Sequence, residues 1–324
     1  MPAGTDRSRD AAADLAAELI VAAVSVEAAE VSRDVPLGPL TTYRVGGRAA
    51  VFVRLFEPTA ITAIATASRS SGLPVLPVGR GSNMLVADRG FDGIAVSVVE
   101  LREVISIDET SAVVTVSAGV SLPVLARKTA AAGLTGFEWA VGVPGSVGGA
   151  VRMNAGGHGS DIAASLIDVT VADLTTGVET RLAAADLGLA FRSSELPETS
   201  VVLEARLQLA PGNADASARI ISEIVAWRRA NQPGGQNAGS VFVNPVPGEV
   251  SSGSLIDAAG LRGERFGTAS VSTKHANFIQ ADDGGSADDV HALMAIVRER
   301  VEATSGFALR SEIKLVGFDG GATS

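Results

Sequence analysis

The stretch Gly142-Val143-Pro144-Gly145-Ser146-Val147-Gly148-Gly149-Ala150 opens a glycine-dense region near the middle of the 324-residue chain. A shorter loop of the same kind, Gly79-Arg80-Gly81-Ser82-Asn83, follows a strand-like run over residues 73–78. Glycine-rich loops expose backbone N–H groups and let phosphate oxygens approach the chain closely. Each loop by itself is also compatible with a set of tight turns. Two of them in one half of the chain, each beside a strand, favour a cradle for a large diphosphate ligand.

Neither loop has the sequence of a common nucleotide-binding motif. The chain contains no Gly-Lys-Ser/Thr, which excludes a Walker loop. The loop at Gly79 lacks the third glycine of the Rossmann fingerprint, and the region after Gly142 does not fit that spacing either. The two loops alone are therefore weak evidence for a nucleotide ligand.

Around these loops, short strands and helices alternate in a way that predicts an α+β fold. Strands are expected over residues 51–55, 73–78, 94–99, 103–107, 112–117, 166–174, 200–209 and 312–316. Helices are expected over residues 58–71, 122–132, 220–229 and 286–301. Gly133 is expected to end the second helix in a left-handed conformation, and Ser286 with Asp289 to begin the last one. Residues 211–214 are a candidate domain boundary.

The composition excludes several classes of protein. With 26 basic and 36 acidic residues the formal net charge is −10, which argues against a nucleic-acid partner or an anionic membrane surface. The chain has no cysteine, so disulfides, thiol nucleophiles and cysteine-ligated metals are excluded. The three histidines, His158, His275 and His291, are widely spaced, and we expect no metal site.

The N-terminal region carries charges within its apolar run. Asp14 and Glu18 interrupt residues 11–24, so neither a signal peptide nor a membrane span fits. We expect a short amphipathic helix or a loose tail there, and a cytoplasmic protein without a membrane partner.

Seven motifs occur in a highly specific order. They cover residues 42–47 (Thr-Tyr-Arg-Val-Gly-Gly), 79–86, 142–150, 153–156 (Met-Asn-Ala-Gly), 239–245 (Gly-Ser-Val-Phe-Val-Asn-Pro), 274–279 (Lys-His-Ala-Asn-Phe-Ile) and 311–313 (Ser-Glu-Ile). From about residue 36 to residue 317, the chain resembles the UDP-N-acetylmuramate dehydrogenase family, also called the UDP-N-acetylenolpyruvoylglucosamine reductase family. That family acts in bacterial peptidoglycan precursor synthesis.

The resemblance implies a PCMH-type FAD-binding domain of two α+β subdomains over residues 36–212. An N-terminal extension over residues 1–35 would precede it, and a smaller α+β substrate-binding domain over residues 213–324 would follow. The residues that the resemblance assigns to FAD are Tyr43, Arg44, Gly46, Gly47, Gly79, Arg80, Gly81, Ser82, Asn83, Pro144, Gly145, Ser146, Gly148, Gly149 and Asn154. Tyr43 is also compatible with a core aromatic beside the site. Because cysteine is absent, we expect non-covalent FAD, with His158 as the residue to check.

The resemblance also implies a reaction in two halves. NADPH would reduce the flavin, and the reduced flavin would pass a hydride to the enolpyruvyl double bond. Negative charge would develop beside the substrate carboxylate, so the site needs a cation and a proton donor. By their positions in the motifs, Arg192 would grip the carboxylate through two parallel N–H bonds, Ser240 would donate the proton and Glu312 would assist as the acidic partner.

Each of these three residues also has a simpler interpretation. Arg192 is compatible with a solvated or salt-bridged arginine. Ser240 is compatible with a turn serine, since an alcohol is a poor acid in water. Glu312 is compatible with a strand-edge carboxylate paired to Lys314 or Arg310.

The uridine diphosphate of the implied substrate requires local positive charge in an acidic protein. Candidate substrate-binding residues are Arg228, Asn244, Lys274, His275 and Asn277. Some members of the family cover the substrate with an inserted loop that carries a tyrosine. Here only residues 193–200 separate Arg192 from the next strand and the sole tyrosine is Tyr43, so the chain resembles the branch without that loop. We expect a monomer.

Two other functions stay open at this point. Another PCMH-type flavin oxidoreductase would absorb as a flavoprotein but would not oxidise NADPH when the enolpyruvyl sugar nucleotide is added. A catalytically silent flavin-binding protein need not retain Arg192, Ser240 and Glu312 together.

Overall fold

The computed structural model describes residues 3–318, which form two compact units that alternate along the chain. Unit 1 comprises residues up to 35, residues 49–80 and residues 92–227. Unit 2 comprises residues 36–48, residues 81–91 and the residues from 228 onward. The mixture of helices and strands confirms the predicted α+β class. The functional division at residues 35 and 212 stays a prediction, because packing units and functional domains need not coincide.

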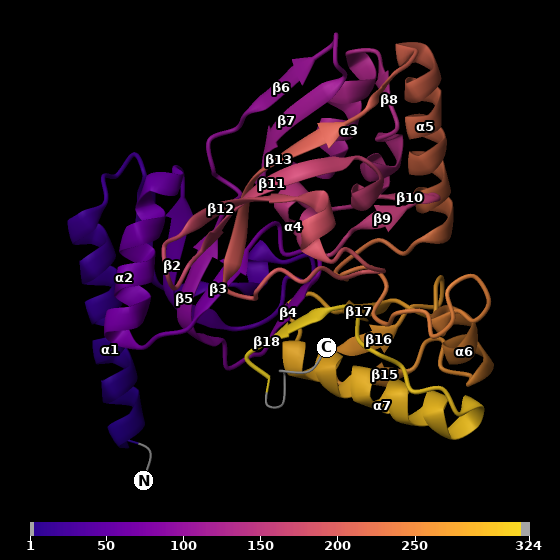
Figure 1. Ribbon diagram of the computed structural model, residues 1–324. Helices are drawn as coiled ribbons and strands as arrows, with labels where there is room; N and C mark the ends of the chain where they lie inside the picture. The colour runs from indigo at the N-terminus through magenta and orange to yellow at the C-terminus, as the bar shows by residue number, and fades with distance from the viewer. Residues whose placement is uncertain (1–2, 319–324) are drawn as a thin grey trace. The chain divides into compact units, whose positions relative to one another are not determined.

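Unit 1 contains a four-stranded sheet with the order β1-β2-β5-β3. Its strands are β1 (Ala29–Pro36), β2 (Arg48–Leu55), β3 (Val75–Val78) and β5 (Phe91–Ser97). Helices α1 (Ala3–Ala23) and α2 (Ile61–Ser71) lie side by side next to this sheet (Figure 1). Of the two possibilities for the N-terminal region, the helix is therefore the correct one, and its Ile20 is buried with Val53 and Ile64 in one apolar cluster.

A second, antiparallel sheet of unit 1 has the order β12-β11-β13-β7-β6. Its strands are β6 (Ile105–Asp108), β7 (Val113–Ser117), β11 (Leu166–Asp173), β12 (Glu179–Ala183) and β13 (Ser200–Gln208). Helices α3 (Leu122–Ala131), α4 (Val147–Arg152) and α5 (Ala214–Asn231) contribute to the same apolar core as this sheet. Leu125, Val147 and Ile221 from these helices share a core with Val116 and Val169 of the sheet. Gly133 has φ +74°, as expected after α3.

Unit 2 is built around a long helix and short strands. Strands β4 (Met84–Val86) and β18 (Lys314–Val316) pair in parallel, and β15 (Arg265–Phe266), β16 (Ala269–Val271) and β17 (Ile279–Ala281) form an antiparallel sheet. Helices α6 (Ser252–Ala258) and α7 (Ala287–Ser305) complete it, with α7 along the three-stranded sheet (Figure 1). The Ser286 hydroxyl accepts a hydrogen bond from Asp289 N at 3.1 Å, which confirms the predicted start of α7.

Short elements connect the longer ones. They are η1 (Gly38–Leu40), η2 (Pro58–Ala60), η3 (Glu138–Gly142), η4 (Ile162–Ala164), η5 (Ala184–Leu187), β8 (Leu134–Thr135), β9 (Gly156–Gly157), β10 (Ser160–Asp161) and β14 (Ala210–Pro211). The helix expected from Pro58 begins as a 3₁₀ turn, and the helix expected from Ile220 already begins at Ala214. β9 and β10 form a tight hairpin next to the glycine-dense region.

Candidate functional site

The two glycine-rich loops meet in unit 1. A Cβ atom placed on Gly79 would lie 3.0 Å from the Ser146 hydroxyl, so the end of β3 lies directly against the start of α4. Ser146 caps α4, because its hydroxyl accepts a hydrogen bond from Gly149 N at 3.4 Å. The convergence that the two loops led us to expect is therefore present for Gly79 and Ser146.

A further glycine near these loops, Gly119, packs closely against neighbouring backbone. A Cβ atom on Gly119, just after β7, would lie 2.3 Å from the Val98 carbonyl oxygen, and the Arg80 guanidinium donates to the Gly119 carbonyl at 3.5 Å. A Cβ atom on Gly148 would lie 2.9 Å from Ala118 Cβ. Any side chain at position 119 would thus collide with backbone. Gly119 was not predicted from the sequence, although a glycine soon after the β-branched residues of β7 is a usable signal.

These loops carry backbone donors that the protein does not use. Among the hydrogen bonds of residues 3–318, none is donated by the backbone N–H groups of Gly79, Arg80, Gly145 or Ser146. Unpaired N–H groups beside glycines that leave the backbone uncovered suit the oxygen atoms of a phosphate. The residues present therefore fit a diphosphate group such as that of FAD.

The segment over residues 40–47 packs closely on its neighbours in unit 2. Gly81 has φ +60°, and a Cβ atom on it would lie 2.3 Å from the Leu40 carbonyl oxygen. Gly46 has φ +115°, and its Cβ would lie 2.2 Å from the Val86 carbonyl oxygen. Gly46 and Gly81 are therefore required for close backbone packing, whatever they contact in a ligand. Arg44, also at positive φ (+56°), is exposed.

Tyr43 is fully buried in the core of unit 2 together with Phe242 and Leu293. Burial raises the pKa of its phenol, and the hydroxyl has no hydrogen-bond partner in the described part of the chain. The interpretation as a core aromatic fits these facts. An unpaired buried hydroxyl also suits a ligand atom, so the contact of Tyr43 with FAD stays a prediction.

Three motifs that are far apart in the sequence meet in unit 2. Glu312 N donates to the Val241 carbonyl at 2.8 Å, and Phe242 pairs with Ser311 in an antiparallel bridge. The Asn83 side chain donates to the Glu312 carbonyl at 2.9 Å. The segment that follows Ser240 therefore runs beside the segment at Glu312. Asn83 of the glycine-rich loop contacts the Glu312 segment.

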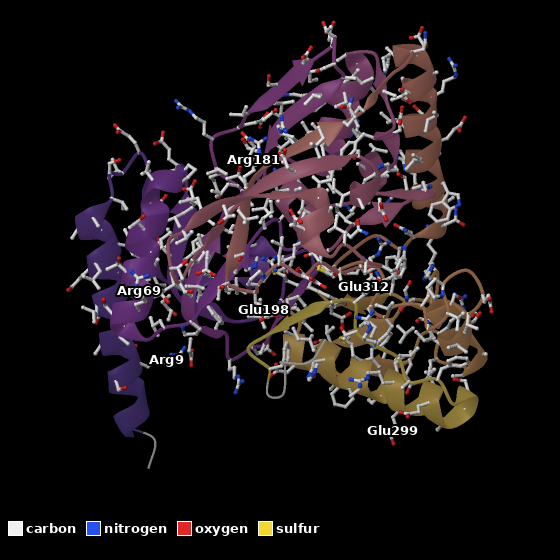
Figure 2. The ribbon with its side chains drawn as sticks, in the orientation of Figure 1. Arg9, Arg69, Arg181, Glu198, Glu299 and Glu312 are labelled. Carbon is white, nitrogen blue, oxygen red and sulfur yellow. The ribbon has the colours of Figure 1, made fainter. Side chains whose placement is uncertain are left out.

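Ser240 and Glu312 differ from their neighbours in exposure. Both are half-buried, whereas Val241, Phe242 and Ile313 are buried. Ser240 makes no side-chain hydrogen bond to any residue that the structure describes. Figure 2 shows Glu312 just before β18. A hydroxyl without a protein partner, held on a buried backbone, is suited to meet a ligand.

Arg192 lies in unit 1 on a tight turn. Ala190 and Ser193 exchange backbone hydrogen bonds of 3.1 and 3.2 Å, and Arg192 takes the third position with φ +58°. That position favours glycine or asparagine, and another residue there costs about 1 kcal/mol or more. The guanidinium donates to the Gly156 carbonyl at 2.8 Å and lies 5.2 Å from the centre of the Phe191 ring. A strained backbone at a non-glycine residue is a reason to test the position for function.

Asn154 supports this turn from the hairpin side. Its amide nitrogen donates to the Ala190 carbonyl at 3.0 Å and to Asp161 Oδ2 at 3.2 Å, and its amide oxygen accepts from Ala163 N at 3.2 Å. The side chain is buried and both ends of its amide bind protein groups. A contact of Asn154 with FAD stays a prediction.

Asn277 holds the backbone next to Ser240. Its buried amide accepts from Phe242 N at 3.0 Å and donates to the Phe242 carbonyl at 2.8 Å. His275 Nδ1 in turn accepts from Asn277 N at 3.3 Å. Burial, followed by the nearby Arg262, lowers the pKa of His275, so the imidazole is neutral near pH 7.

The remaining candidate substrate-binding residues also contact protein groups or lie partly buried. Lys274 Nζ donates to the Arg229 carbonyl at 2.7 Å, which caps the end of α5. The Asn244 amide oxygen accepts a hydrogen bond at 3.0 Å from the backbone N–H of Ser252, the first residue of α6. Burial lowers the pKa of Arg228, which stays charged at any physiological pH. Substrate contacts of these residues stay predictions.

Two other expectations concern histidine and metals. His158 lies at the tip of the β9–β10 hairpin at φ +52°, and its ring packs edge-on against Trp227 at 5.1 Å. Within residues 3–318, no three metal-ligating side chains come together. No helix in that part of the chain is long and apolar enough to cross a membrane.

The fold and the converging glycine-rich loops define an FAD-binding protein. Residues 49–182 match the family model described as an FAD binding domain. Residues 231–316 match the model described as the C-terminal domain of UDP-N-acetylenolpyruvoylglucosamine reductase. The chain belongs to the UDP-N-acetylenolpyruvoylglucosamine reductase family.

Individual relatives agree with this assignment. The chain is 43% identical over 287 residues to the UDP-N-acetylenolpyruvoylglucosamine reductase of Gloeobacter violaceus, covering 87% of this chain and 95% of that protein. It is 41% identical to the Synechococcus enzyme, with 88% and 93% covered. The crystal structure of the Thermus caldophilus enzyme matches with a TM-score of 0.75 and 32% identity, over 89% of this chain and 99% of that one.

Proposed function

We propose that this protein reduces the enolpyruvyl group of UDP-N-acetylenolpyruvoylglucosamine to give UDP-N-acetylmuramate, with NADPH as the reductant. Non-covalently bound FAD supplies the hydride carrier between the two substrates. The observation that supports the proposal is the set of hydrogen bonds that join Asn83, Val241 and Glu312, because Val241 directly follows the expected proton donor and Asn83 belongs to the glycine-rich loop.

Arg192 binds the substrate carboxylate in this proposal. Hydride addition to the methylene carbon leaves negative charge on the neighbouring carbon and on its carboxylate. A guanidinium stabilises such a charge through two parallel N–H bonds. The strained φ of Arg192 supports this role, since a merely solvated arginine gives no reason to retain an unfavourable backbone conformation.

Ser240 donates a proton to the carbon that carries the negative charge. A hydroxyl is a weak acid, so this role requires a fixed position and a route for the proton to be restored. The buried backbone over Val241 and Phe242 supplies the fixed position. Glu312, whose backbone is bonded to the same strand, assists when it is protonated or through a bridging water.

The FAD-binding set comprises the residues of the two glycine-rich loops together with the segment over 43–47. The backbone N–H groups of Gly79, Arg80, Gly145 and Ser146, which donate no hydrogen bond to the described protein, would bind the diphosphate oxygens. Ser82 and Asn83 supplement them. Pro144, Gly148 and Gly149 shape the second loop. Gly46 packs against Val86 of β4, and Gly47 packs against the turn at residues 88–90 that follows it.

The uridine diphosphate of the substrate is held by Arg228 and Lys274, with Asn244, His275 and Asn277 fixing the surrounding loops. Since the side chains of Asn244 and Asn277 already bind backbone groups, their contribution is to position neighbouring residues. We also infer a cytoplasmic protein, as the absence of cysteine favours, without a nucleic-acid partner, as the net charge of −10 favours, and we expect it to be a monomer. Sedimentation at micromolar concentration tests the monomer.

One preparation tests the proposed function. The purified protein is expected to absorb near 450 nm and to oxidise NADPH continuously, beyond the one equivalent that reduces the flavin, only after UDP-N-acetylenolpyruvoylglucosamine is added. Flavin absorbance without this substrate-dependent oxidation would identify a different flavin oxidoreductase or a silent flavin-binding protein. A colourless protein that does not take up FAD would contradict the cofactor assignment.

A further inference from the structure

The loop over residues 188–199, which carries Arg192, has little apolar packing of its own. It joins η5 to β13, and Leu196 is its one buried residue, in a stretch that the structure describes completely. The turn at Ala190–Ser193 closes on itself through two backbone hydrogen bonds. Such a loop depends on polar contacts from its surroundings for a fixed conformation.

Arg152, the last residue of α4, provides these contacts on the C-terminal side of the turn. Its guanidinium donates to the carbonyls of Leu196 at 3.2 Å and Pro197 at 3.1 Å, and also to the carbonyl of Ser200. In the opposite direction, the Ser194 hydroxyl donates to the Arg152 carbonyl at 2.7 Å. Arg152 thus binds the loop at Ser194, Leu196 and Pro197, and binds the start of β13 at Ser200.

The N-terminal side of the turn is bound by the residues that follow Arg152. Asn154 donates to the Ala190 carbonyl, and the Gly156 carbonyl accepts from the Arg192 guanidinium. The segment 152–156 therefore contacts the turn on both sides and its arginine directly. Of these contacts, those of Arg152 span the longest part of the loop.

We propose that Arg152 is a positioning residue for Arg192: by binding two carbonyls of the loop and the carbonyl of Ser200 at the start of β13, it fixes the turn from which Arg192 grips the substrate carboxylate. This inference rests on the proposed function. It assigns no substrate contact to Arg152. It explains how the short loop that carries Arg192 keeps a fixed conformation.

The test compares Arg152→Met, which keeps an apolar stem but removes all donors, with Arg152→Lys, which keeps the charge and fewer donors. Arg181→Met is the matched control, since Arg181 is an exposed arginine on β12 of the same unit, paired with Asp168 (Figure 2). Flavin content and the rate of flavin reduction by NADPH serve as measures of intact folding. Neither is expected to change in any of the three variants.

Reoxidation of the reduced flavin by the enolpyruvyl substrate is the informative step. We expect Arg152→Met to slow it on the order of 10- to 100-fold and to raise KM, because a catalytic group displaced by about 1 Å loses about that much. Arg152→Lys should recover part of the rate. In an Arg192→Met background, Arg152→Met should add less than about a twofold effect, since residues that act through one another are not additive.

A second readout does not depend on activity. Trypsin cleavage after Arg192, followed by mass spectrometry, should accelerate by about 10-fold or more in Arg152→Met and stay unchanged in Arg181→Met, because cleavage follows the population of opened loop. Unchanged cleavage, or an equal slowing of reoxidation with and without Arg192, would overturn the inference. If the substrate does not reoxidise the reduced flavin of the wild-type protein, the proposed function is wrong. The cleavage experiment then still tests whether Arg152 holds the loop in place.

Discussion

The turn that carries Arg192 and the extended segment that carries Ser240 are held by different means. The Arg192 turn has a strained backbone and is fixed by polar side chains, with Asn154 on one side and Arg152 on the other. Ser240 instead precedes the buried residues Val241 and Phe242 in an apolar core. The two proposed site groups are thus fixed by different forces: hydrogen bonds hold the turn of Arg192, and apolar burial holds the segment that follows Ser240.

The largest loss of activity is expected at Ser240. Ser240→Ala should lower kcat by about 10²-fold or more, since it removes a positioned proton donor. The melting temperature should stay the same, because the Ser240 hydroxyl has no bond to any described residue. Ser222→Ala, on the exposed face of α5, is the control and should change neither quantity. An unchanged kcat in Ser240→Ala would remove Ser240 from the mechanism.

In the turn at residues 190–193, Arg192→Gly should lower activity without lowering stability. We expect kcat/KM to fall by about 10²-fold through loss of the carboxylate contact. Glycine is favoured at φ +58°, so the free energy of unfolding should be unchanged or rise by up to about 1 kcal/mol. Chemical denaturation measures it. A loss of stability by more than about 1 kcal/mol would show that Arg192 is held for structural reasons.

The segment that follows Ser240 should also depend on its supporting residue Asn277 for stability. Asn277→Ala leaves the buried N–H and carbonyl of Phe242 without partners and should cost about 2–4 kcal/mol of unfolding free energy. Asn277→Asp keeps an acceptor for Phe242 N and should cost less. Urea titrations of both variants check this order, and a reversed order would contradict the assigned hydrogen bonds.

The smallest effect concerns pH. His275 has a pKa lowered mainly by burial, so the unfolded chain binds a proton at higher pH than the folded protein does. Stability should therefore fall as the pH drops below the unfolded value of about 6.5 toward the folded value. Because the side chain is only half-buried, solvent screening limits the effect to a fraction of a kcal/mol. Melting temperatures at pH 7.5 and 5.5 should show a smaller drop for His275→Gln, and an identical drop would contradict this account.

Local patterns predicted the longer elements but not the way the units interleave. The apolar spacing in α7 and the β-branched runs of β7 and β13 are visible in the sequence, and the capping pair Ser286–Asp289 was found where expected. The association of residues 81–91 with β18 could not be predicted, because a contact over more than 200 positions leaves no local signal. The strands β15–β17 are too short for a period to show.

The candidate site shows the same division. Ser240, Glu312 and Asn83 were identified from their motifs, and the structure places their backbones together. The amides of Asn154 and Asn277 were assigned to ligands, yet they bind backbone groups of neighbouring loops. Residue type alone does not distinguish these two uses of an asparagine. The strained turn at Arg192 was also invisible, because Ala-Phe-Arg-Ser contains no glycine that would indicate a positive φ.

The most direct test of the central claim is a stopped-flow measurement of the two half-reactions in wild-type protein and in Ser240→Ala. NADPH should bleach the 450 nm absorbance at the same rate in both proteins. The enolpyruvyl sugar nucleotide should then restore it in the wild type, and about 10²-fold more slowly or worse in Ser240→Ala. Equal slowing of both half-reactions would make Ser240 a structural residue, and equal restoration in both proteins would contradict its role as the proton donor.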